Sequence, residues 1–167
     1  VWEGALETLL GRIGGHEHDE GNRCLALIAA APLVECGVPK TAAAVLKAAA
    51  EAPPRARATA LRVLKRAPQG DWGAKAASVM VSCLDEQDRH IRLAAAECLE
   101  VMSYDIVASA TLSRHLADPD RHVRAACAAT LLAWGPSLDL PTSRKVLLLA
   151  STADPPLYAA LARGLAA

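Results

Sequence analysis

The chain has 167 residues, a balanced charge and very few aromatic residues. These properties argue against a strongly basic nucleic-acid or membrane binder and against a fold built on a β-sheet. Lys and Arg total 18, as do Asp and Glu, so a net charge of zero gives no overall attraction to nucleic acid or anionic membranes. Hydrophobic residues make up 53% of the chain but aromatic residues only 3%, with no Phe, so Ala, Leu and Val supply the apolar mass. Because Ala favours helices and sheets favour β-branched and aromatic residues, this composition predicts helices packed on helices.

The spacing of apolar residues, together with Gly and Pro, predicts five helix pairs within a single domain. In chain order, the first helices of the pairs are expected at residues 2–13, 40–51, 72–84, 106–117 and 142–152. Their partners are expected near 20–31, 55–66, 89–102, 121–134 and 157–166. The corresponding units cover approximately residues 1–36, 37–69, 70–102, 103–136 and 137–167. Pro and Gly mark the breaks, because Pro cannot continue a helix and presets φ for a first helical turn.

An internal repeat is the strongest signal in the sequence. Residues 88–99 align without gaps with residues 120–131, and both segments begin Asp-Arg-His-(Ile/Val)-Arg. Weaker copies place Arg23 and Arg57 at the position of Arg92 and Arg124. Self-similarity at a period of 20–50 residues is typical of solenoids, in which stacked units complete one another's core.

The motif of a short Asp/Pro turn followed by Asp-x-x-(Val/Ile)-Arg-x-x-Ala resembles HEAT repeats. This resemblance implies a right-handed superhelix of antiparallel helix pairs, with a ladder of Asp and Arg along the turns between helices. The positions that match the ladder are Asp19, Arg23, Arg57, Asp88, Arg92, Asp120 and Arg124. The residues themselves leave two structural readings open. Each Asp caps a helix start while its Arg bridges to a neighbouring repeat, or the Asp caps and the Arg is solvated.

Signals for catalysis, cofactors or metals are weak. No P-loop, H-E-x-x-H, G-x-S-x-G or G-x-G-x-x-G motif is present, and we expect neither catalytic residues nor a cofactor. The dyad His16-Glu17 resembles those of deoxyhypusine hydroxylase, a HEAT-type metalloenzyme, but the other repeats lack it, so we expect a polar loop. Five cysteines without a Cys-x-x-Cys pair predict buried thiols in a reducing, cytoplasmic compartment: Cys24, Cys36, Cys83, Cys98 and Cys127.

Positive charge is concentrated near the second helix of the second pair, where residues 55–66 contain five basic residues and no acidic one. With two further arginines they form a candidate basic binding face: Arg55, Arg57, Arg62, Lys65, Arg66, Arg89 and Arg121. Such a strip can bind phosphate backbones, as the resemblance to HEAT-like alkylpurine glycosylases would imply. The scarcity of aromatic residues for stacking argues against single strands, and a solvated helix face is the simpler interpretation.

The most favoured function is therefore a non-catalytic scaffold or adaptor that binds another protein or peptide, with nucleic-acid binding as the alternative. No apolar run reaches the roughly 18 residues of a membrane span, so we expect no membrane partner. The last helix pair is poor in charge, and its leucines predict self-association through the C-terminal end. Because the chain opens at Val1 rather than Met, we also expect a processed product or a piece of a longer protein.

Overall fold

The computed structural model describes residues 2–15, 19–66 and 73–151, and within these ranges every regular element is helical. No strand occurs in them, which confirms the all-α class expected from the composition. The helix expected at 157–166 lies outside the described residues. Contacts between helices divide the chain into two compact units, Val1–Trp72 and Gly73–Ala167, which are described in turn.

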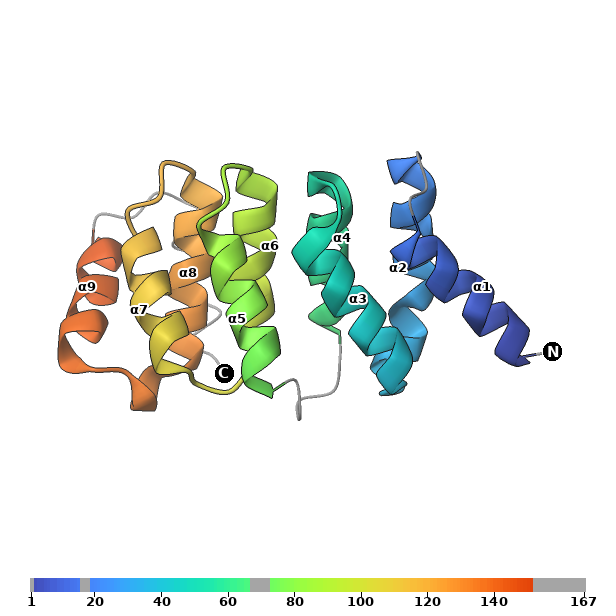
Figure 1. Ribbon diagram of the computed structural model, residues 1–167. Helices are drawn as coiled ribbons and strands as arrows, with labels where there is room; N and C mark the ends of the chain where they lie inside the picture. The colour runs from blue at the N-terminus through green and yellow to red at the C-terminus, as the bar shows by residue number, and fades with distance from the viewer. Residues whose placement is uncertain (1, 16–18, 67–72, 152–167) are drawn as a thin grey trace. The chain divides into compact units, whose positions relative to one another are not determined.

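The first unit contains four helices in two layers (Figure 1). They are α1 (Trp2–Gly14), α2 (Glu20–Glu35), α3 (Pro39–Glu51) and α4 (Pro54–Leu64). Helix α1 packs on α3 and α2 packs on α4, so the first and second helices of each pair form separate layers. Helices α2 and α4 run in the same direction, because Cys24 meets Thr59 near their starts and Glu35 meets Arg66 near their ends.

Helix α2 continues four residues beyond the end expected from the sequence, through Pro32. Pro32 has no N–H, so one backbone carbonyl in the preceding turn lacks its helical hydrogen bond. Because Pro32 lies on the exposed side of the helix, water can donate to that carbonyl instead. The helix ends at Glu35, and Gly37, which follows the C-cap Cys36, has a φ of 72° in the left-handed region. The N–H of Gly37 donates to the Val34 carbonyl and that of Val38 to the Leu33 carbonyl, as in a Schellman motif.

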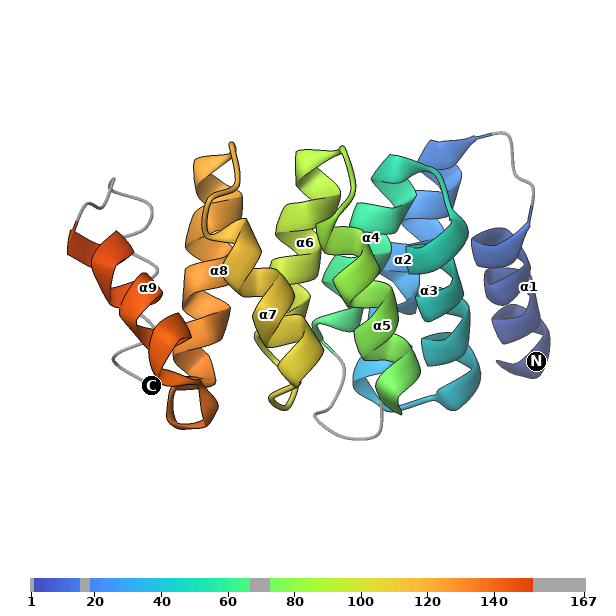
Figure 2. The same ribbon diagram turned by 60° about the vertical axis from the view of Figure 1, so that its left-hand side comes forward.

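The second unit repeats this arrangement with further helices (Figure 2). They are α5 (Gly73–Leu84), α6 (Arg89–Leu99), α7 (Ile106–His115), α8 (Arg121–Ala133) and α9 (Leu140–Ser151), with a short 3-10 turn, η1, at Gly135–Ser137. Helix α5 packs on α7 and α6 packs on α8, while α9 packs on α8.

Helices α6 and α8 contain the two closest copies of the repeat, and they lie side by side in the same direction. The Thr130 hydroxyl donates to the Ala96 carbonyl over 2.8 Å, and the Trp134 indole N–H donates to the Met102 carbonyl over 2.9 Å. Helix α6 ends at Leu99 rather than at residue 102, and the backbone N–H groups of Val101 and Met102 donate to the carbonyls three residues back, those of Cys98 and Leu99.

The apolar stripes read from the sequence form the core between these layers. The stripe expected here runs from Ile91 to Met102. Its members Ile91, Ala94, Ala95, Cys98 and Leu99 are at most 1% exposed, whereas Met102, beyond the end of α6, is only half-buried. One cysteine expectation is wrong: Cys36 is exposed, whereas the other four thiols are buried. Cys36 follows the last turn of α2 as its C-cap, where no neighbouring helix covers it.

Candidate functional site

The four arginines that the repeat aligns occupy the same local position in each copy. Each guanidinium reaches back to a backbone carbonyl in the last turn of the preceding helix or in the connection after it. Arg23 donates to the Gly15 carbonyl and Arg57 to that of Ala49. Arg92 and Arg124 make equivalent contacts in the second unit. The repeated arginine therefore holds its own turn closed, since carbonyls left over at a helix end need donors.

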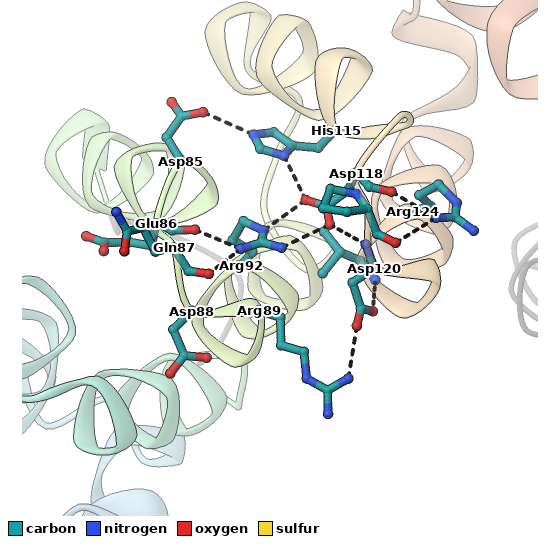
Figure 3. A network of polar contacts seen from close by, with 12 residues as sticks. Asp85, Glu86, Gln87, Asp88, Arg89, Arg92, His115, Asp118, Asp120 and Arg124 are labelled. Atoms are coloured by element: carbon teal, nitrogen blue, oxygen red, sulfur yellow. Dashed lines mark hydrogen bonds and ion pairs between the residues drawn. The ribbon is translucent and has the colours of Figure 1, made fainter.

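Arg92 contacts two successive turns, as Figure 3 shows. Its Nη1 donates to the carbonyls of Glu86 and Gln87 over 2.9 and 2.7 Å. Its Nε and Nη2 donate to the two carboxylate oxygens of Asp118 over 2.8 and 3.0 Å. The side chains of Arg92 and Asp118 are only 11% and 2% exposed. This bidentate pair joins the α5–α6 turn to the α7–α8 turn, 26 residues away along the chain.

Asp118 is the centre of a wider polar network. It also accepts the backbone N–H of Asp120 over 2.8 Å, and its Oδ2 lies 3.2 Å from Nδ1 of His115. The other ring nitrogen of His115 lies 3.1 Å from the carboxylate of Asp85, in the preceding turn. A second connection between the same two turns therefore runs through the histidine (Figure 3).

The electrostatic balance of this network favours the charged forms of its central pair. Burial alone would raise the pKa of Asp118, but hydrogen bonds from Arg92, the Asp120 N–H and His115 together lower it below its ordinary value. The hydrogen bond with Asp118 in turn raises the pKa of Arg92. Both groups are thus ionised at neutral pH, which keeps the ion pair between the two turns intact.

The aspartates named from the sequence have a different role from that of Asp118. Asp19, Asp88 and Asp120 are N-caps of α2, α6 and α8, and each accepts a backbone N–H from the first turn of its helix. The carboxylate of Asp120 also accepts a hydrogen bond from the guanidinium of Arg89 over 3.0 Å. The carboxylate that receives Arg92 is Asp118, which the sequence reasoning missed. A signal was present: an acid stands two residues before the capping aspartate in both close copies, as Glu86 and as Asp118.

The candidate basic face is only partly available for binding. Arg57 is half-buried against the Ala49 carbonyl, and Arg66 pairs with Glu35 over 3.3 Å. Lys65 also has an interaction partner. Arg55 and Arg62 both lie on α4 and are exposed. In the second unit Arg89 pairs with Asp120, and the Arg121 guanidinium lies against His122.

An exposed apolar strip on α2 was not foreseen from the sequence. Leu25 and Ile28 are 65% and 58% exposed, and Ala29 and Pro32 are exposed beside them. The buried residues of α2, which include Leu27 and Ala30, face the core of the first unit, so α2 is apolar on both sides. Helical spacing alone could have located this second stripe, because residues 25, 28, 29 and 32 recur at helical intervals.

Metal binding and membrane crossing receive no support from the described residues. Within residues 2–15, 19–66 and 73–151, no group of three or more His, Cys, Asp or Glu side chains is placed to hold a metal ion. The His16-Glu17 dyad lies outside these ranges. No helix in the same part of the chain is both long enough and apolar enough to span a bilayer.

Comparison with known proteins leaves the family open. No protein-family model matches the chain, and a search of curated proteins finds none that is significantly similar.

Proposed function

We propose that the chain is a HEAT-like α-solenoid whose five helix pairs form a non-catalytic scaffold for another protein. The turn contacts support the architecture. Arg23, Arg57, Arg92 and Arg124 follow one another at intervals of 34, 35 and 32 residues, and each donates to a carbonyl at the end of the preceding helix or in the connection after it. An arginine-to-carbonyl contact that recurs at this spacing is typical of stacked, equivalent units.

The single observation that carries the binding function is the apolar strip on α2. Leu25 and Ile28 each leave more than half of their side chain in water, on a helix whose opposite side already fills the core. Clustered, exposed aliphatic side chains on a helix commonly mark a protein interaction site. Removing them from water on binding contributes roughly 25 cal/mol per Å² of apolar surface.

The test uses the full chain as bait in an extract of its own cells. Retained proteins are quantified by mass spectrometry for the wild type, for Ile28→Glu and for Ala43→Glu, which introduces the same charge at an exposed position of α3. We expect at least one protein that the wild type and Ala43→Glu retain equally and that Ile28→Glu loses. Identical sets from all three baits would refute a binding role for the strip.

Nucleic-acid binding is the second candidate, and the cationic α4 is the observation in its favour. Three members of the candidate basic face are occupied by carbonyls or carboxylates, namely Arg57, Arg66 and Arg89. Fewer positive side chains are therefore available to bind phosphate groups than the seven basic residues of the candidate face suggest. Binding to labelled duplex and single-stranded oligonucleotides that weakens steeply with salt would favour this alternative.

A further inference from the structure

The apolar strip on α2 and the cations of α4 belong to one surface, here named the α2–α4 face. It comprises Leu25, Ile28, Ala29, Pro32, Arg55, Arg62 and Arg66. Three contacts fix the register of the two helices. Glu20 accepts the backbone N–H groups of Arg55 and Ala56, Thr59 donates to Cys24, and Arg66 pairs with Glu35.

The same register places Ile28 opposite the part of α4 between Thr59 and Arg66. Arg55 and Arg62 are seven residues, about two turns, apart and share the exposed side of α4, and the exposed Arg66 follows just beyond the end of the helix. The aliphatic strip of α2 therefore has a row of arginines along one of its edges.

The charge on this face is positive. Helix α4 contains no acidic residue. Glu20, the acid nearest its start, is committed to the first N–H groups of α4. Glu35 faces Arg66 in a solvent-exposed pair, so the positive charge of the face rests on Arg55 and Arg62. Among the described residues no carboxylate lies within ion-pair distance of the Arg55 or Arg62 guanidinium.

We infer that the α2–α4 face binds an acidic, amphipathic helical segment of another protein, an inference that rests on the proposed scaffold function. The segment places bulky apolar residues against Leu25 and Ile28 and directs Asp or Glu toward Arg55 and Arg62. The strip from Leu25 to Pro32 spans eight residues, about 10 Å along a helix, which suits about two turns of a partner helix. Anchors at positions i, i+3 or i+4 and i+7 are the pattern of a helix lying on such a surface.

The aliphatic character of the face favours a peptide over a nucleic acid. Residues 19–66 contain no aromatic side chain on which a base could stack. The methyl groups of Leu25 and Ile28 would gain nothing from a phosphate backbone, whereas leucine-type side chains of a peptide cover them. Arginine at the rim then supplies orientation and a faster approach for an acidic partner.

The experiment selects ligands from a random 16-residue peptide library displayed on phage, with the full chain immobilised. Selected peptides are synthesised with a fluorescent label, and their Kd values are measured by anisotropy for wild type, Ile28→Glu, Arg62→Glu and two controls. The controls, Ala43→Glu and Arg12→Glu, make the same changes at exposed positions on α3 and α1. Circular dichroism checks that each variant keeps its helices.

We expect enriched peptides with a net negative charge and apolar residues at helical spacing. Ile28→Glu and Arg62→Glu should each weaken their binding about ten-fold or more, as the loss of an interface anchor does. The controls should change Kd by less than about two-fold, within the range of residues outside an interface.

Other outcomes separate this inference from the proposed function. Neutral or basic peptides that bind through Ile28 but are insensitive to Arg62→Glu would overturn the acidic partner and leave the scaffold standing. Failure to enrich any peptide would overturn the inference, and if the cell extract also yields no protein sensitive to Ile28→Glu, the scaffold fails as well. Labelled oligonucleotides that bind wild type and lose affinity with Arg62→Glu, but not with Ile28→Glu, would assign the face to nucleic acid instead.

Discussion

Replacing Arg92 with Ala tests whether the buried pair with Asp118 holds the two turns of the second unit together. The substitution removes four hydrogen bonds, two to the carboxylate of Asp118 and two to the carbonyls of Glu86 and Gln87. Removing one partner of a buried ion pair destabilises by about 3–5 kcal/mol, because the other charge is left uncompensated. Asp118 keeps its contacts with the Asp120 N–H and His115, which reduce that penalty. We therefore expect a loss of about 3 kcal/mol.

Urea unfolding followed by far-UV circular dichroism measures this loss. The matched control is Arg89→Ala, one turn earlier on α6, whose pair with Asp120 leaves the arginine 59% exposed. An exposed pair contributes at most about 1 kcal/mol, so the control should be nearly neutral. A double-mutant cycle with Asp118→Asn should give a coupling energy of about 1–3 kcal/mol. Equal effects of Arg92→Ala and Arg89→Ala, or a loss under about 0.5 kcal/mol for Arg92→Ala, would refute the buried-pair reasoning.

Three further measurements probe other features of the molecule. Because the folded state lowers the pKa of Asp118 below 3.8, its contribution to stability is complete above that ordinary value. This contribution is lost as the pH falls through the lowered pKa, so Asp118→Asn should flatten the decrease in unfolding free energy below about pH 4, and an unchanged slope would contradict this. Cys36 should react at once with a thiol reagent, while Cys98 and Cys127 react only after denaturation, since both are buried and burial raises the pKa of the Cys127 thiol. Rapid native labelling of Cys98 and Cys127 would show that the apolar stripes are wrongly placed. Leu147 is 66% exposed on α9, so the average mass from light scattering should rise with concentration for wild type and not for Leu147→Glu. A monomeric wild type at all concentrations would remove the case for self-association.

The positions of the helices could be read from the sequence because helical order is local and periodic. Apolar residues every three or four positions define a buried stripe, and Asp before a run of helix formers defines a start. On this basis Asp88 and Asp120 are expected as helix starts, where the structure has them as N-caps, and a stripe is expected from Ile91 to Met102, of which the part up to Leu99 is buried. Two boundaries differ from the expected ones: α2 continues through a solvent-facing Pro32 and stops before the left-handed Gly37, and α6 ends at Leu99.

The equivalence of the four arginines was also contained in the sequence, but their acceptors were not. Which carboxylate meets Arg92 depends on how closely the α5–α6 and α7–α8 turns approach, and Asp118 is 26 residues away from it along the chain. Arg57 and Arg62 look alike in sequence, yet one is held by a carbonyl and the other is exposed. A helical wheel shows that α2 is apolar on two sides, but only the packing of its neighbours determines that Leu27 is buried and Ile28 is left in water.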